Sequence, residues 1–387
     1  MEGKVVYFDN NATTMVAPEV FEAMTPFLTK LYGNPSSIHT FGGQVMAHVD
    51  AARERLAALL GANPSEVIFT SCGTESDNAA LRSAVFTTGR KKVVTSVVEH
   101  PAILNVAKDL ERSGYKVDRI PVDANGRLDM ARAAEMIDDE TAIVSVMWAN
   151  NETGNIQPVM ELAELAHSRG ALFHTDAVQA VGKVPMNLAE SPIDFLSLSG
   201  HKLHAPKGVG ALYVKRGVRF HAFVIGGHQE DSRRAGTENV ASIVGLGVAA
   251  ELANQNIRKE DDYVRSLRDR LEHGVLSQIP KTKVNGDIEH RLPNTTNISF
   301  EFIEGESILM LLDQYGVCAS SGSACTTGSL EPSHVLRAMG VPYTSAHGSI
   351  RFSFSRYNTV EEVDFVLEKL PPIIARLREL SPYWKQN

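Results

Sequence analysis

The stretch VIFTSCGTESDN, residues 67–78, determines the fold class that we expect. Its first four residues are apolar or β-branched, as in a short buried strand, and a polar segment compatible with a helix follows from Thr74 onward. The preceding residues 51–60 have helical spacing and stop at Gly61, a residue type that commonly ends helices. Together these residues predict one β-α unit.

Strand-like runs and helical patterns alternate from about residue 50 to residue 220. Each further run is flanked by polar or glycine residues, and the runs are residues 93–98, 143–148, 172–174 and 195–198. Repeated units of this kind predict an α/β fold with a mostly parallel sheet.

The C-terminal part of the chain has a different pattern. After Gly236, helical stretches at residues 241–254 and 261–278 are followed by alternating apolar and polar residues. We therefore expect a large α/β domain over residues 15–258. A smaller α+β domain is expected from residues 1–14 and 259–387.

The composition argues against several classes of protein. The 387 residues carry a formal net charge of −8, which does not favour a nucleic-acid-binding surface. The N-terminus does not have the pattern of a secretory signal, and the apolar runs are too short to cross a bilayer. We therefore expect a cytoplasmic protein without a membrane span. Its three cysteines, Cys72, Cys318 and Cys325, are expected to be reduced thiols.

Polar residues follow the predicted strands, where the ligands of open parallel sheets bind. These residues are Cys72, Gly73, Thr74, Glu99, His100, Asn150, Asn151, Asp176, Gln179, Ser199, Gly200, His201 and Lys202. Their convergence predicts a ligand site at the carboxyl edge of the sheet.

Two of these turns could hold a phosphate group. Gly73 and Thr74 lie between a strand and a helix, where backbone amides, the helix dipole and a hydroxyl point at one place. Residues 199–201 offer further donors. An ordinary turn with a helix cap is the alternative for each segment alone.

Asp176 and Lys202 together favour a pyridoxal cofactor. A carboxylate opposite a heteroaromatic nitrogen keeps that nitrogen protonated, and a lysine amine can bind the cofactor covalently. The alternatives are a helix N-cap for Asp176 and a surface position for Lys202.

Two further residues have side chains suited to chemistry. Cys325 lies in a small, polar stretch, which predicts a mobile loop and the exposure that a nucleophilic thiol needs. Arg351 points away from the apolar face of its predicted strand and could bind a carboxylate, with a surface salt bridge as the alternative. The G-x-G-x-x-A match at residues 245–250 lies in a helical pattern without a preceding strand, so we interpret it as a close-packed helix.

Nine segments in order resemble the NifS/IscS-type cysteine desulfurases, pyridoxal-phosphate enzymes of the aspartate aminotransferase fold (type I). They are YFDNNATT, GNPSS, TSCGTESDN, VVEH, MWANNETG, HTDAVQA, SLSGHK, RRAGTEN and SSGSACTTGSLEPSHVL. The Cys-Gly-Thr-Glu and Cys-Thr-Thr-Gly segments are most similar to the nitrogen-fixation NifS branch.

The resemblance implies a role for each matching residue. The implied catalytic residues are Cys325, Lys202 and His100. The implied cofactor-binding residues are Gly73, Thr74, His100, Asn151, Asp176, Gln179, Ser199, Gly200, His201 and Lys202, with Thr237 reaching the phosphate of the neighbouring subunit. The implied substrate-binding residues are Asn34, Asn151 and Arg351.

The resemblance also implies the reaction and the partners. L-cysteine would be converted to L-alanine while its sulfur passes to Cys325 as a persulfide, for iron–sulfur cluster assembly and nitrogenase maturation. A homodimer and a NifU/IscU-type scaffold protein are implied, with Cys325 as a transient iron–sulfur cluster ligand. An aminotransferase or a selenocysteine lyase of the same fold would use Lys202 in the same way but would not need Cys325. A sulfur-relay hub with little turnover is a further alternative.

The chain departs from the family pattern at two places. Residues 229–232 read Gln-Glu-Asp-Ser where relatives usually read Gln-Glu-Arg-Gly. This loses a positive charge near the expected dimer contact and puts loop order, partner docking or phosphate affinity there in question. Ala205 replaces a common glycine, which predicts either a backbone with negative φ or an altered turn.

Overall fold

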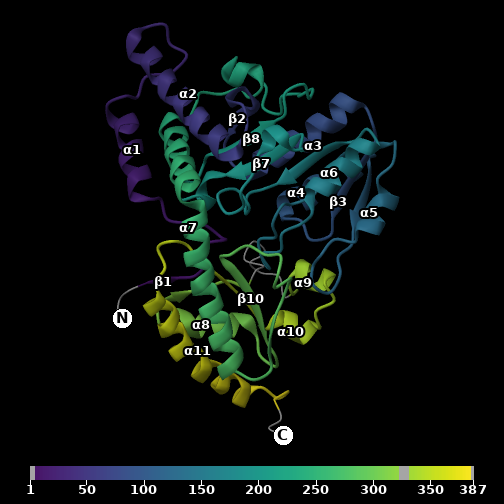
Figure 1. The fold of residues 1–387 in the computed structure, drawn as a ribbon, viewed down its shortest axis with the longest axis vertical. Helices are drawn as coiled ribbons and strands as arrows, with labels where there is room; N and C mark the ends of the chain where they lie inside the picture. The colour runs from purple at the N-terminus through teal and green to yellow at the C-terminus, as the bar shows by residue number, and fades with distance from the viewer. Residues whose placement is uncertain (1–4, 322–330, 385–387) are drawn as a thin grey trace.

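The computed structural model describes residues 5–321 and 331–384, which form two layered parts along the long axis (Figure 1). The helix α7 (Val240–Gln278) runs through both parts. No helix among the described residues is long and apolar enough to cross a membrane.

A seven-stranded sheet forms the centre of the first part. Its strands, in spatial order, are β2 (Val67–Thr70), β8 (Gly210–Val214), β7 (Phe195–Ser199), β6 (Leu172–Asp176), β5 (Thr141–Ser145), β3 (Lys92–Ser96) and β4 (Lys116–Ile120). Only β8 runs antiparallel to its neighbours, β2 and β7. The predicted α/β class with a mostly parallel sheet is therefore confirmed.

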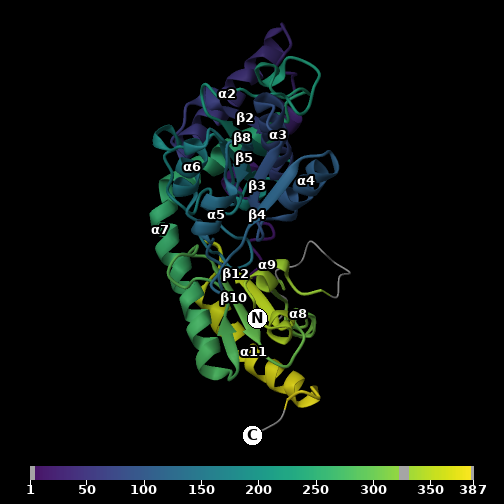
Figure 2. The ribbon, with the colours of Figure 1, turned by 90° about the vertical axis from the view of Figure 1, so that its right-hand side faces the viewer.

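Helices cover both faces of this sheet. They are α1 (Pro18–Thr29), α2 (Thr40–Leu60), α3 (Gly73–Thr88), α4 (Pro101–Arg112), α5 (Met130–Met136) and α6 (Val159–Ser168). Figure 2 shows the sheet between α6 on one side and α3 with α4 on the other. Because both faces are covered, the central strands are buried throughout and carry apolar runs rather than a polar alternation.

The second part is built on smaller sheets. β9 (Thr282–Val284), β10 (Thr295–Phe300) and β12 (Ser349–Ser353) pair antiparallel, and β1 (Val6–Tyr7) pairs parallel with β11 (Val317–Cys318). The helices here are α8 (Gly305–Asp313), α9 (His334–Ala338), α10 (Tyr343–His347) and α11 (Val360–Leu380). This part has a hydrophobic core of its own, which includes Phe8, Leu271 and Phe352.

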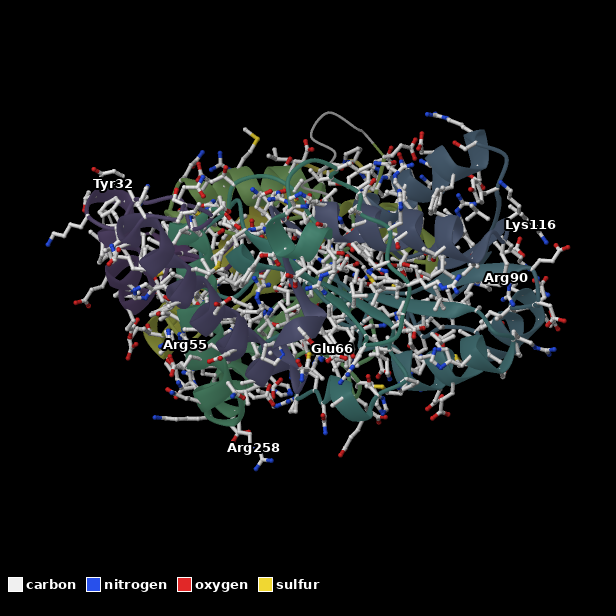
Figure 3. All side chains as sticks on the ribbon, turned by 90° about the horizontal axis from the view of Figure 1, so that it is seen from above. Tyr32, Arg55, Glu66, Arg90, Lys116 and Arg258 are labelled. Atoms are coloured by element: carbon white, nitrogen blue, oxygen red, sulfur yellow. The ribbon has the colours of Figure 1, made fainter. Side chains whose placement is uncertain are left out.

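The structure corrects one predicted detail, because the two helical stretches expected at 241–254 and 261–278 are one helix. The residues between them, Gln-Asn-Ile-Arg-Lys-Glu, include no proline or glycine that would break it. Arg258 projects from this stretch into solvent (Figure 3). The predicted domain boundary at 258 thus falls inside α7, and the assignment of residues 15–258 to one domain stays a proposal.

The G-x-G-x-x-A segment is a close-packed helix, as predicted. A Cβ atom added at Gly247 would lie 2.5 Å from the Cα atom of Ala52, so only glycine lets α7 approach α2 this closely. The segment is part of the packing between these helices and lies in no strand-to-helix turn.

Candidate active site

A cavity of about 420 Å³ lies at the carboxyl edge of the seven-stranded sheet. Its lining comes from the N-terminal segment, the start of α3, the N-cap of α4, the segment after β5, the ends of β6 and β7 with the residues that follow them, and one residue of β12. The lining residues are Asn11, Ala12, Cys72, Gly73, Thr74, Asp77, His100, Met147, Ala149, Asn151, Asp176, Val178, Gln179, Ser199, His201, Lys202 and Arg351. Most of the side chains that the sequence placed after the strands therefore meet in one cavity.

The start of α3 presents backbone amides to this cavity. Within the described residues, the N-cap residue Cys72 makes no side-chain hydrogen bond to the first turn, so no side chain caps the amides there. A Cβ atom at Gly73 would lie 2.7 Å from Cγ2 of Val178, so this position accepts glycine alone without a shift. An uncapped helix N-terminus with a close backbone approach is suited to a phosphate group.

His201 lies beside this phosphate-sized space. Its Nδ1 atom is 3.1 Å from Oγ1 of Thr13. Burial, with the positive charges of Lys202 and Lys207, lowers the pKa of His201 to about 4, so the ring is neutral at neutral pH. The ring can donate a hydrogen bond to an anion without adding a full charge.

Asp176 ends β6 and is 6% exposed. Its Oδ1 atom accepts a hydrogen bond from the amide of Val178 at 3.0 Å. Burial raises its pKa, and the nearby His100 and Lys202 oppose that rise. A buried, charged carboxylate of this kind is stabilised when a cation or an N–H donor binds next to it in the cavity.

The amine of Lys202 reaches the N-terminal segment. Its Nζ atom donates to the carbonyl oxygens of Asn11 and Ala12, both at 2.6 Å. Gln179 Nε2 donates to the same Asn11 oxygen at 3.0 Å, whereas its buried Oε1 atom has no hydrogen-bond partner within the described part of the chain. The Oε1 atom of Gln179 could therefore accept a hydrogen bond from a donor on a group bound in the cavity.

His100 closes another side of the cavity. It is the N-cap residue of α4, and its Nδ1 atom accepts a hydrogen bond from the amide of Ala102 at 3.2 Å, which fixes the ring. Burial lowers the pKa of His100, so its ring is mostly neutral at neutral pH. A fixed neutral ring can stack on an aromatic group.

Arg351 extends from β12 to the cavity and is 3% exposed. Its guanidinium donates to the carbonyl oxygen of Asn151 at 2.9 Å and forms an ion pair with Asp9 at 2.7 Å. The buried Nε atom has no partner among the residues described. Arg351 therefore presents a buried cation to the cavity from the second part of the molecule.

The sequence analysis missed a second carboxylate in this cavity. Asp77 is 1% exposed, and burial followed by the charge of Asp176 raises its pKa. Behind it, His174 lies between the hydroxyls of Ser145 (2.8 Å) and Ser197 (2.9 Å), and burial lowers the pKa of His174 to about 3. The sequence spacing could have predicted this position of Asp77. Asp77 follows Gly73 by four residues and therefore lies on the same face of α3.

The Aminotransferase class-V family matches residues 6–366. The chain belongs to the class-V aminotransferase family. It is 59% identical over 384 residues to the protein named cysteine desulfurase NifS from Azotobacter vinelandii. The aligned residues cover 99% of this chain and 96% of that protein. The structure of a NifS-like protein has a TM-score of 0.91 and 39% identity and covers 97% of this chain and 100% of that chain. The structure of SspA in complex with cysteine has a TM-score of 0.81 and 32% identity, with coverage of 91% and 99%.

These comparisons confirm the resemblance and the predicted type I fold of the class-V aminotransferases. Enzymes of this family depend on pyridoxal phosphate. The cavity fits that group, because it offers an uncapped helix N-terminus, a buried carboxylate at Asp176, an amine at Lys202 and an unpartnered acceptor at Gln179. The individual roles of these residues stay predictions.

Four predicted site residues of this class-V aminotransferase are not placed in the cavity by the described part of the structure. Gly200 is not among the lining residues, and its amide donates to the carbonyl oxygen of Val209 at 2.9 Å. Asn34 accepts a hydrogen bond from the amide of Ser36 at 2.9 Å, outside the lining. Thr237 lines a different pocket. Cys325, with the predicted mobile loop, lies outside the described residues.

The two departures from the family pattern have local structures. Glu230 forms a bidentate ion pair with Arg53 at 2.6 and 2.8 Å, and residues 230–232 all have positive φ. Ala205 is not among the described residues with positive φ, which agrees with the first of its two predicted forms, whereas His204 has φ 63°.

Proposed function

We propose that this protein is a cysteine desulfurase, which converts L-cysteine to L-alanine and transfers the sulfur to Cys325. The main support is the single cavity that unites Lys202, Asp176, the start of α3 and Arg351. The chain that carries this cavity is 59% identical over nearly its full length to a protein named cysteine desulfurase NifS.

In this proposal the cavity holds pyridoxal phosphate, with its phosphate at Gly73, Thr74, Ser199 and His201. Lys202 binds the cofactor covalently. Asp176 would pair with the ring nitrogen, His100 would stack on the ring, and Gln179 and Asn151 would contact the ring oxygen. When bound, the cofactor supplies an electron sink for the charge that develops at the substrate Cα atom.

Arg351 binds the carboxylate of L-cysteine, and Asn151 helps to orient the substrate, whereas the position of Asn34 outside the cavity lining gives no support to its implied contribution. A buried guanidinium is suited to this task because its planar fork can donate two hydrogen bonds to a carboxylate. The amine of Lys202, released by the substrate amine, takes the Cα proton as a general base.

Sulfur transfer requires Cys325 as a thiolate. Its sulfur attacks the substrate sulfur, so that the new S–S bond forms as the substrate C–S bond breaks. The electron pair of the broken bond stays with the three-carbon fragment, which takes up a proton and leaves as L-alanine. Cys325 keeps the sulfur as a persulfide, and no external oxidant or reductant is needed in this half of the reaction.

The proposal includes the partners that the family resemblance implied. A homodimer would bring Thr237 of one subunit to the phosphate of the other, which agrees with its position outside the cavity of its own chain. A NifU/IscU-type scaffold would take the sulfur for iron–sulfur clusters and nitrogenase maturation. The cytoplasmic location and the iron–sulfur ligation by Cys325 stay predictions.

The direct test is alanine release from L-cysteine by the purified protein, with pyridoxal phosphate and a reductant but without a keto acid. We expect equal amounts of alanine and sulfide. Cys325→Ser should stop sulfur transfer yet keep the cofactor bound, whereas the matched variant Cys318→Ser should stay active.

Alanine formation that requires a keto acid would contradict the proposal and favour an aminotransferase. Activity with selenocysteine alone would favour a selenocysteine lyase.

A further inference from the structure

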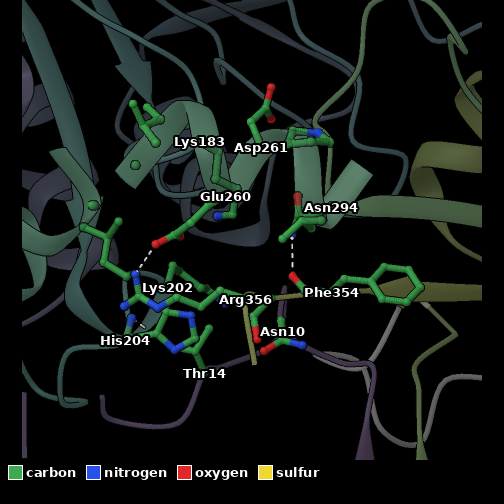
Figure 4. Close-up of a pocket in the computed structure, with 17 residues that line it drawn as sticks. Asn10, Thr14, Lys183, Lys202, His204, Glu260, Asp261, Asn294, Phe354 and Arg356 are labelled. Carbon is green, nitrogen blue, oxygen red and sulfur yellow. Dashed lines mark hydrogen bonds and ion pairs between the residues drawn. The ribbon is translucent and has the colours of Figure 1, made fainter. Parts of the chain in front are cut away.

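Two cavities share Lys202 in their lining, and they differ in size. The smaller one, of about 60 Å³, is lined in part by α7 and by the segments after β6, β7 and β12 (Figure 4). It has room for a few water molecules, since one water needs about 10–15 Å³ by this kind of measure. A thiol that takes the substrate sulfur must therefore reach the larger cavity, which has His100, Asn151 and Arg351 in its wall.

The segment that carries Cys325 begins at a backbone contact with this wall. The amide of Ser320 donates to the carbonyl oxygen of Arg351 at 3.2 Å, and the amide of Arg351 donates to that of Ser320 at 2.6 Å. Cys325 follows Ser320 by five residues. The residue that is proposed to bind the substrate carboxylate therefore also fixes the N-terminal end of this segment.

A side-chain hydrogen bond fixes the other end of the segment. Oγ of Ser333, which lies eight residues after Cys325, donates to Oε2 of Glu152 at 2.5 Å. Both side chains are buried, and the same Oγ atom accepts from two amides in the first turn of α9. The bond therefore joins the start of α9 to the residue next to Asn151 in the cavity wall.

The backbone around Glu152 is held in a tight turn. Oδ1 of Asn150 accepts from the amide of Glu152 at 2.9 Å and from the amide of the next residue at 3.0 Å. The carbonyl oxygen of Asn151 accepts from the guanidinium of Arg351 at 2.9 Å. Ser333 thus binds a carboxyl group whose place relative to Arg351 is set by these hydrogen bonds.

Other contacts hold α9 itself against the first part of the molecule. Nε2 of His334 donates to the carbonyl oxygen of Glu99 at 2.9 Å, and Leu336 lies in a hydrophobic cluster with Val98. These contacts do not involve Glu152. Loss of the bond to Ser333 should therefore release the chain before α9 and leave the helix in place.

We propose that Glu152 is a positioning residue for sulfur transfer, because its hydrogen bond with Ser333 fixes the C-terminal end of the segment that carries Cys325 beside the substrate site. This inference rests on the proposed function. Fixing an end of a segment raises the effective concentration of a group that the segment carries. Loss of the bond should slow sulfur transfer and spare the proton chemistry of Lys202.

The test compares two reactions of the same holoenzyme. The first is the rate at which Cys325 gains sulfur from L-cysteine in a single turnover. The second is exchange of the Cα hydrogen of L-alanine for solvent deuterium, which needs Lys202 and Arg351 but no thiol. Glu152→Met, which removes the acceptor at similar length, should slow transfer by about tenfold and change exchange by less than about twofold. Glu152→Gln, which keeps an oxygen acceptor, should restore transfer.

The matched control is Glu161→Met at an exposed site on α6, which should leave both rates unchanged. Ser333→Ala removes the donor instead. A double variant of Glu152→Met and Ser333→Ala should be no slower in transfer than the slower single variant, because both changes remove the same bond. If Glu152→Met does not fold, Ser333→Ala and its rescue by Ser333→Thr make the same comparison.

Three results would overturn the inference alone while the wild type transfers sulfur. They are unchanged transfer in Glu152→Met, an equal loss of transfer and exchange, and a double variant whose loss is the product of the single losses. A wild-type holoenzyme that exchanges the Cα hydrogen but puts no sulfur on Cys325 would overturn the proposed function and this inference with it.

Discussion

The pKa of the buried residue Glu99 is higher in the folded protein than in the unfolded chain. Glu99 is fully buried, accepts from Ser96 Oγ at 2.5 Å and from the amide of Met147, and burial raises its pKa to about 8. Between pH values of about 4.5 and 8 the folded state keeps a proton that the unfolded state releases. The free energy of unfolding therefore falls as the pH rises through this window.

Glu99→Gln should remove this pH-dependent loss, because the amide cannot ionise. We expect its thermal midpoint, relative to the wild type, to increase steadily from about pH 5 to about pH 8. Thermal unfolding at three pH values measures the difference, and the exposed Glu54→Gln serves as control. A difference that is the same at every pH would show that Glu99 does not carry the proton.

Arg351 offers a second test at the residue scale. Its ion pair with Asp9 holds the guanidinium in place but also competes with a substrate carboxylate. Arg351→Lys should raise KM for L-cysteine by about tenfold or more, because the bidentate contact with the carboxylate is lost. The decrease in kcat should be smaller than this increase in KM. Steady-state kinetics test this expectation, and a kcat effect without a KM effect would contradict the assigned role.

At the scale of elements, the sequence predicted strands where apolar runs end in polar or glycine residues. The run at 195–198 matches β7 closely, whereas the run predicted at 143–148 starts inside β5 and extends past its end at Ser145. Residues 146–149 are as buried as the strand, so hydrophobicity alone could not locate its end. The continuity of α7 was missed because a polar stretch resembles a loop.

The start of α3 carries a prediction of its own. Gly73→Ala should weaken pyridoxal phosphate binding by about tenfold or more while the protein stays folded, because the new Cβ atom would meet Val178 at 2.7 Å. Gly43→Ala on α2, where the nearest contact would be an ordinary 3.6 Å, is the control. Cofactor affinity measured by fluorescence or dialysis decides the point, and equal affinities would contradict the phosphate site.

The segment with residues 230–232 adds a test of backbone strain. Ser232 has φ 64°, a conformation that costs a residue with a β-branched side chain about 1–2 kcal/mol. We expect Ser232→Val to lower the free energy of unfolding by about that amount, and Ser232→Gly to change it by less than about 1 kcal/mol. Denaturant unfolding measures both, and equal stability of the two variants would show that the segment relaxes.

At the scale of the whole molecule, the sequence predicted most of the cavity but not all of the site. Asp176, Lys202 and Gly73 lie at or just after the carboxyl ends of strands, so the topology of the sheet brings them together. Arg351 comes from β12, far along the chain, and its approach to Asp9 and Asn151 depends on how the two parts pack. Such long-range contacts leave no local pattern in the sequence.

The family resemblance, which places Thr237 at the phosphate of the neighbouring subunit, predicts that a complete site needs two subunits, and Thr237 lies outside the cavity of its own chain. Lys202→Ala should be inactive alone, and Thr237→Ala should be weakly active. Mixed subunits should regain activity, because one site of each heterodimer then has both residues intact. No recovery after subunit exchange, checked by sedimentation of the dimer, would contradict the shared site.

The central claim is sulfur transfer to Cys325, and a single turnover tests it most directly. The holoenzyme is mixed with less than one equivalent of L-cysteine without reductant, and alanine and the masses of the cysteine-containing peptides are measured. We predict one alanine for each added sulfur atom, with that sulfur on Cys325 and not on Cys72 or Cys318. Alanine without added mass on Cys325, or sulfur on another cysteine, would contradict the account.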